Sequence, residues 1–102
     1  MEPSPDPEDR TLNHLELLEA NHQFPGSYTI KAIGPASKEF EKRVLEITLS
    51  HLAAESDLDF SVRSTAGGRH MAITLEMTVQ SAKQVHEIYS EIREVEELIL
   101  LL

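Results

Sequence analysis

Apolar and polar residues alternate in three stretches of the chain, a pattern typical of β-strands with one buried face. The stretches are residues 27–33 (SYTIKAI), 58–64 (LDFSVRS) and 71–79 (MAITLEMTV), and they alternate because successive side chains of a strand point to opposite sides. The second and third stretches flank the pair Gly67 and Gly68, which favours a hairpin turn. We therefore predict three strands, the last two of them joined as a β-hairpin.

Two other stretches repeat their apolar residues every three or four positions, which predicts amphipathic helices. The first runs from Ala36 to Leu52 and the second follows Ser81. Ser81 and Gln84 have the spacing of a capping box, in which the serine hydroxyl and the glutamine side chain each satisfy a free amide group. The second helix is therefore expected to begin directly after Ser81.

The run LILLL, residues 98–102, is strongly apolar but short. A helix that spans a bilayer needs about 20 such residues, so we interpret the run as a fourth strand. Alternation would turn its even-numbered leucines toward the core and leave Ile99 and Leu101 on the open side. Because an edge strand of this composition invites pairing with another chain, we expect Ile99 and Leu101 to contribute to an interface.

The predicted order of elements is strand, helix, strand, strand, helix, strand. Each strand has one apolar face and each helix has one apolar side, so both helices are expected to cover the same face of one antiparallel sheet. This arrangement is the ferredoxin-like βαββαβ fold of the α+β class. In that topology the first and third strands are central, and the second and fourth lie at the edges.

The region before the domain divides at residue 10. Residues 1–10 hold three prolines and five charges, and they have too few large apolar groups to offset the entropy of ordering. They are predicted to form a disordered acidic tail. Residues 11–23 carry leucines at near-helical spacing, which predicts a short helix and linker. The domain itself is expected to comprise residues 24–102.

Length and composition narrow the classes of function. A chain of 102 residues forms one domain with little room for a deep enclosed active site. It has no cysteine, which removes disulfides, thiolate metal ligands and thiol nucleophiles, and fits a reducing cytosol. The formal net charge of −9 disfavours binding to nucleic acids and to anionic membranes. We expect a cytoplasmic protein.

Several segments together resemble a known family. The pair FP, the stretch YTIKAIG, the hairpin GGRHMAITLEMTV and the helix SAKQVHEIYSEI resemble the YbeD-like family of small bacterial proteins over residues 24–102. The resemblance implies a ferredoxin-like domain without an established activity, similar in fold to ACT-type regulatory domains of amino-acid metabolism; some members are labelled lipoate-linked regulators. It carries over no catalytic residue. His70 stands where the family has an aromatic residue.

Other functions of this fold find little support in the sequence. RNA-binding versions stack bases on aromatic residues of the central strands, whereas the open faces predicted here have none and include Glu76. None of the five histidines forms a pair at metal-ligand spacing. We therefore predict no metal site, no cofactor and no catalytic residue. RNA binding is a disfavoured alternative, and an enzyme is the least favoured.

The turn after the first strand is a candidate site for a small anionic ligand. The helix that follows presents free amide hydrogens, and Gly34 allows close approach to the backbone. Positive charge can come from Lys31, Lys38 and Arg63. An ordinary strand-to-helix turn is the favoured explanation of the same residues.

These patterns predict a non-enzymatic regulatory or protein-interaction module that forms a homo-oligomer, most simply a dimer, or binds a protein partner. The alternative is an ACT-like sensor that binds an amino acid or a lipoate-type ligand at a dimer interface. Neither nucleic acid nor a membrane is expected as a partner. A stable protein partner would support the first hypothesis, and a ligand-dependent melting temperature would support the second.

Overall fold

The computed structural model describes residues 7–65 and 67–102. Its elements are, in chain order, α1 (Pro7–Asn21), β1 (Gly26–Pro35), α2 (Lys38–Ser50), the 3-10 turn η1 (Glu55–Asp57), β2 (Leu58–Ser64), β3 (His70–Val79), α3 (Ala82–Ile92) and β4 (Leu100–Leu101). The strand order in the sheet is β2-β3-β1-β4, and every neighbouring pair is antiparallel. The predicted ferredoxin-like α+β topology is confirmed, with β1 and β3 in the centre.

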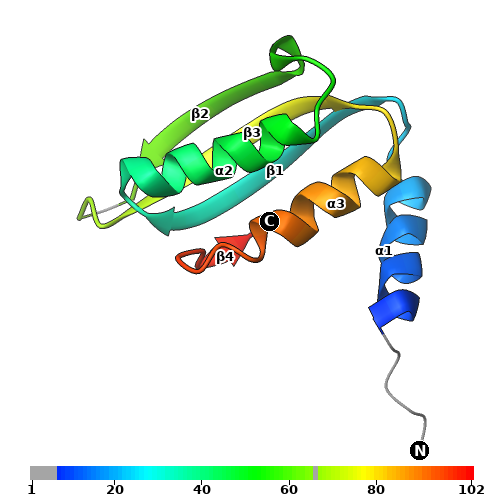
Figure 1. Ribbon diagram of the computed structural model, residues 1–102, viewed down its shortest axis with the longest axis horizontal. Coiled ribbons are helices and arrows are strands. Elements are labelled where there is room, and N and C mark those ends of the chain that lie inside the picture. The colour runs from blue at the N-terminus through cyan, green and yellow to red at the C-terminus, as the bar shows by residue number, and fades with distance from the viewer. Residues whose placement is uncertain (1–6, 66) are drawn as a thin grey trace, which may run out of the picture.

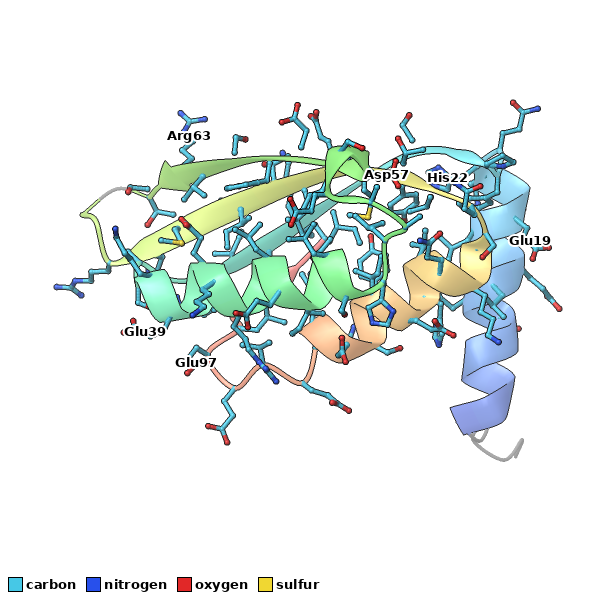
Figure 2. All side chains as sticks on the ribbon, turned by 45° about the horizontal axis from the view of Figure 1, so that its top comes forward. Glu19, His22, Glu39, Asp57, Arg63 and Glu97 are labelled. Atoms are coloured by element: carbon cyan, nitrogen blue, oxygen red, sulfur yellow. The ribbon has the colours of Figure 1, made fainter. Side chains whose placement is uncertain are left out.

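The helices α2 and α3 lie on one face of the sheet, and the other face is open (Figure 1; Figure 2). The alternation within the central strands explains this arrangement. Ile30 in β1 and Leu75 in β3 are fully buried beneath the helices, whereas Lys31 and Glu76 are exposed on the open side. Burial of the apolar face stabilises the layers by roughly 25 cal/mol for each Å² removed from water.

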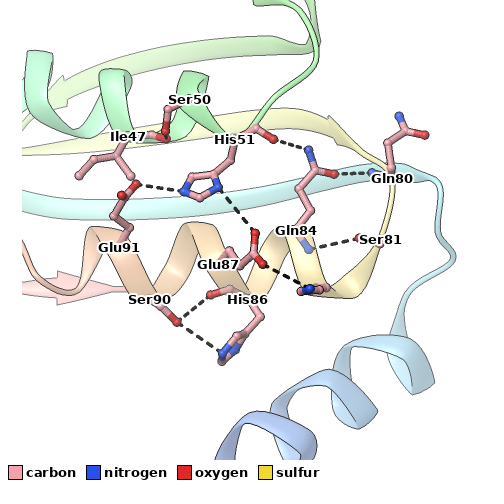
Figure 3. Close-up of polar contacts among 11 residues, drawn as sticks. Ile47, Ser50, His51, Gln80, Ser81, Gln84, His86, Glu87, Ser90 and Glu91 are labelled. Carbon is pink, nitrogen blue, oxygen red and sulfur yellow. Dashed lines mark hydrogen bonds and ion pairs between the residues drawn. The ribbon is translucent and has the colours of Figure 1, made fainter.

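Serine residues cap the starts of α2 and α3. The Ser37 hydroxyl accepts a hydrogen bond from an amide of α2 at 3.1 Å, and the Ser81 hydroxyl accepts one from the Gln84 amide at 3.2 Å. The second half of the predicted capping box is wrong, because the Gln84 side-chain oxygen accepts from the Gln80 amide at 2.7 Å. The same side chain donates to the carbonyl of His51 at 2.6 Å, so Gln84 ties α3 to the end of α2 (Figure 3).

Removing the cap of α3 tests its contribution. Ser81→Ala is expected to lower the free energy of unfolding by about 1 kcal/mol, because the Gln84 amide loses its acceptor. Urea denaturation followed by circular dichroism measures this change. The matched control is Ser61→Ala at an exposed position of β2, which is expected to stay within about 0.5 kcal/mol of the wild type. Equal losses in the two variants would argue against the cap.

The helix α1 begins at Pro7, earlier than the predicted start at residue 11. Residues 7–10, expected in the disordered tail, are therefore helical, and proline is well suited to a first helical turn because its missing amide hydrogen has no partner there. Residues 1–6 of the predicted tail lie outside the described residues. Figure 1 places α1 at one end of the molecule, beside the start of α3. No helix among the described residues is long and apolar enough to cross a membrane.

Candidate functional site

The residues of the predicted ligand site lie on two sides of the sheet. Lys31 in β1 and Arg63 in β2 are exposed on the open face, and Figure 2 shows the Arg63 side chain pointing away from the helices. Lys38 is exposed at the start of α2, on the helix-covered side. The three positive charges are therefore not gathered around the turn that follows β1.

Gly34 is explained by packing inside the protein. It is buried on the helix-covered side of β1, where a β-carbon at this position would overlap the ring of Phe40 from α2. Phe40 is itself only 2% exposed. The missing side chain of Gly34 thus makes room for an aromatic ring of the core, and this accounts for the glycine without a ligand.

The leucines of β4 face the opposite sides of the sheet from those predicted. Leu101 pairs with the buried Ala32 and packs against the core, although it was predicted on the open side. Leu100 and Leu102 are 46% and 59% exposed, although they were predicted to point inward. The predicted interface residue Leu101 therefore contributes to the core of its own chain, and Leu100 takes its place on the open side.

The cause of this reversal lies in the turn that precedes β4. The Leu98 amide donates to the carbonyl of Val95 at 3.1 Å, so Leu98 belongs to a turn and alternation begins only with the strand. Leu98 packs against the core, as predicted, and Ile99 is 59% exposed. Inward and outward positions therefore do not alternate through the whole run.

An apolar patch occupies one corner of the open sheet face. Ile33 is the register partner of Ala72 in β3 and of Leu100 in β4, and Leu102 lies two residues further along the same side. We call this set, Ile33, Ala72, Leu100 and Leu102, the open-face patch. It spans three adjacent strands and borders the free edge of the sheet.

The rest of the open face is polar and carries balanced charge. Two basic residues, Lys31 and Arg63, and two acidic residues, Asp59 and Glu76, lie on the exposed sides of β1, β2 and β3. This balance contrasts with the formal net charge of −9 for the whole chain. Repulsion between two copies of the protein is therefore weakest when their open faces approach each other.

A polar cluster joins α2 to α3 on the covered side of the molecule (Figure 3). The Nε2 atom of His51 is 3.0 Å from a carboxylate oxygen of Glu91, and its Nδ1 atom is 3.9 Å from Glu87. Together with His86, these residues line an open hollow of about 390 Å³. No group of three or more metal-ligating side chains occurs in the described part of the chain, so we interpret the cluster as a link between helices.

A second cluster lies between α1 and α3. His14 and His86 are hydrogen-bonded through their Nδ1 atoms, and the His14 ring contacts Tyr89 edge to face, with ring centroids 5.6 Å apart. The Tyr89 hydroxyl is 3.2 Å from that of Tyr28. Burial, assisted by this hydrogen bond, raises the pKa of Tyr89, so its phenol stays neutral across the physiological range.

Comparison with known proteins places the chain in a family. A family model described as "Protein of unknown function (DUF493)" matches residues 19–102. The chain belongs to the DUF493 family. A UPF0250 protein of Vibrio vulnificus is 31% identical over 86 residues, which cover 84% of this chain and 91% of that protein. A UPF0250 protein of Shewanella sediminis is 32% identical over 81 residues, which cover 79% and 85% respectively.

Membership of the DUF493 family confirms the resemblance to YbeD-like proteins and assigns no activity. The match begins at residue 19, inside α1, so most of that helix precedes the matched region. The histidine pair was not found from the sequence, because His14 and His86 are 72 positions apart and show no ligand spacing. The only available signal was the leucine pattern of residues 11–23, which indicated a docked helix but not its partner.

Proposed function

We propose that this DUF493 protein is a non-enzymatic interaction module that acts as a dimer, in which two copies meet through their open sheet faces. The single observation that carries this proposal is the open-face patch, whose leucines Leu100 and Leu102 are 46% and 59% exposed. Exposed aliphatic side chains that are contiguous across neighbouring strands are typical of a surface that binds another protein.

A second copy of the chain is the partner that best fits this surface. The charges of the open face balance, whereas the chain as a whole is strongly acidic. A two-fold axis places the same patch of both copies together, and it can bring Lys31 of one copy toward Glu76 of the other. Opposite charges around an apolar centre favour one orientation of the two faces.

The free edge of the sheet contributes less than the patch. Lys31 and Leu102 exchange backbone hydrogen bonds of 3.0 and 2.8 Å, so the neighbouring Leu101 turns its amide and carbonyl groups away from β1. With two residues in β4, few backbone groups are available to a further strand. Very short edge strands are a common protection against unwanted pairing, and this favours contact through side chains of the face.

Solution mass tests the proposal directly. The wild-type chain is expected to be dimeric at high micromolar concentration by sedimentation equilibrium, and Leu100→Lys is expected to be monomeric, because it places a charge at the centre of the patch. Leu17→Lys is the matched control: Leu17 is 63% exposed but lies on α1, and this variant is expected to remain dimeric. A monomeric wild type, or a dimer that Leu100→Lys leaves intact, would refute the proposed function.

A further inference from the structure

Within residues 13–21, the part of α1 whose side chains are described, the helix contacts the domain through leucines and through the ring of His14. Leu18 is 4% exposed and belongs to the core, and Leu15 packs against its margin. The hydrogen bond joins His14 of α1 to His86 of α3, with their ring centroids 4.7 Å apart. A change at the histidines therefore acts directly on the contact between α1 and α3.

The neighbouring Ser90 favours one arrangement of the hydrogens on the two rings. The Ser90 hydroxyl donates to the carbonyl of His86 at 2.9 Å, which leaves its oxygen free to accept from Nε2 of His86 at 3.5 Å. A neutral His86 ring with its hydrogen on Nε2 presents Nδ1 as an acceptor. In this neutral pair His14 donates from its own Nδ1, and protonation excludes the hydrogen bond only when both Nδ1 atoms carry a hydrogen.

The described groups that face His14 are uncharged or positive. Tyr89 packs on its ring and Arg93 follows on the same side of α3. From β1, Tyr28 reaches the cluster through its hydroxyl contact with Tyr89. The described carboxylates of α1, Glu16 and Glu19, are exposed.

Carboxylates occur on the other side of His86. The nearby acidic side chains of α3 and the following turn line the hollow that His86 shares with His51, and they are Glu87, Glu91 and Glu94. Glu87 and Glu91 are engaged with His51. They belong to the link between α2 and α3, whereas His14 approaches His86 from α1.

We propose that α1 is a pH-released cover, which docks on α3 while the His14 and His86 rings are neutral and detaches when acid protonates them. A first proton places a cation in a partly buried position near Arg93. A second proton puts hydrogen on both Nδ1 atoms, which leaves two donors facing each other without an acceptor. The first step adds an unfavourable charge to the docked state, and the second removes the hydrogen bond.

The direction of the pKa shift supports this geometry. Burial, then the proximity of His86 and of Arg93, lowers the pKa of His14 below its usual value of 6.5. A group whose pKa is lowered in the docked state stabilises docking fully above the ordinary pKa. That stabilisation is lost as the pH falls from there through the lowered value. Release is therefore expected on the acid side of neutrality.

Detachment would uncover an apolar surface beneath the helix. Leu18 would leave the contact it makes with the core, and the Tyr89 ring would lose the cover that His14 provides. The sheet, α2 and α3 are expected to keep their core, since Leu18 is the one described member of the core cluster that comes from α1. The surface that detachment exposes lies on the helix-covered side of the sheet, opposite the open-face patch.

Hydrogen exchange on the full chain tests the cover. Amides of residues 13–21 are compared at about pH 7.5 and about pH 5.6, after correction for the intrinsic pH dependence of exchange. We expect their protection to fall about five- to tenfold at the lower pH through uptake of one proton, while the amides of β3 stay protected. The lower pH still lies above the isoelectric point of about 4.9, which keeps the protein anionic.

Two variants separate the histidine pair from other effects of acid. His14→Gln cannot be protonated and is expected to abolish the pH response of α1. His22→Gln is the matched control, because His22 lies at the end of the same region and contacts Tyr28 rather than His86; it is expected to respond like the wild type. Equal protection at both pH values, rapid exchange at both, or a pH response that persists in His14→Gln would each overturn the proposal.

Discussion

Phe40→Ala is expected to lower the free energy of unfolding by about 3–5 kcal/mol, the cost of removing a large aromatic ring from a well-packed core. Phe40 is 2% exposed and lies between α2 and the central strand, where its ring fills the space above Gly34. A domain of this size is stable by about 5–15 kcal/mol, so the variant is expected to lose a large share of its stability. Thermal and urea denaturation measure the loss.

The chain supplies its own control for this substitution. Phe60→Ala removes the same ring from the edge strand β2, where the side chain is 47% exposed, and its cost is expected to be about 1 kcal/mol or less because little apolar area returns to water. Both variants remove the same side chain, so the difference between their losses of free energy of unfolding measures the effect of burial. Comparable losses would show that Phe40 is not the centre of the core.

Gly34→Ala is expected to destabilise the protein by about 1–3 kcal/mol, because the new methyl group overlaps the Phe40 ring and forces the helix and the strand apart. Gly34 pairs with Met71 of β3, and the preceding Ile33 pairs with Leu100 of β4, so the backbone has little freedom to move aside. Urea denaturation gives the loss, and circular dichroism checks that the secondary structure survives.

A double variant identifies the ring as the cause. Phe40→Leu frees space above residue 34, so Gly34→Ala should cost less in a Phe40→Leu background than in the wild type. The coupling between the two sites is expected to reach about 1 kcal/mol, as is usual for residues in direct contact. Strictly additive losses would mean that Gly34 serves another purpose, such as close approach of a ligand.

The sequence was sufficient to predict the topology because each strand has one buried side and each helix one apolar side. In β1 and β3, Ile30 and Leu75 are fully buried whereas Lys31 and Glu76 are exposed, so alternation determined both the sheet and the position of its helices. Ser81 marked the start of α3 in the same local way. These features depend on residues close together in the chain.

The features that the sequence could not supply depend on distant contacts. The register with β1 and the turn at Leu98 decide which sides of the sheet Leu100 and Leu101 face. A run made only of leucine and isoleucine contains no signal for the register or for the turn. The pairing of His14 with His86 depends on how α1 docks. The four residues of the predicted ligand site, Lys31, Gly34, Lys38 and Arg63, lie apart for the same reason. Their neighbours depend on the direction of each side chain in the folded protein.

The position of β1 in the sheet also shapes how the chain folds. Both strands that pair with β1 are made after it, and partners such as Gly26 and Val79 are separated by about half of the polypeptide. Such non-local pairing makes folding slow, so β1 is synthesised well before its backbone can be paired. The helix α2 follows β1 directly, and its Phe40 can settle on Gly34 early. That local contact covers part of the apolar face of β1 before its partner strands are made, which lowers the tendency of the new chain to aggregate.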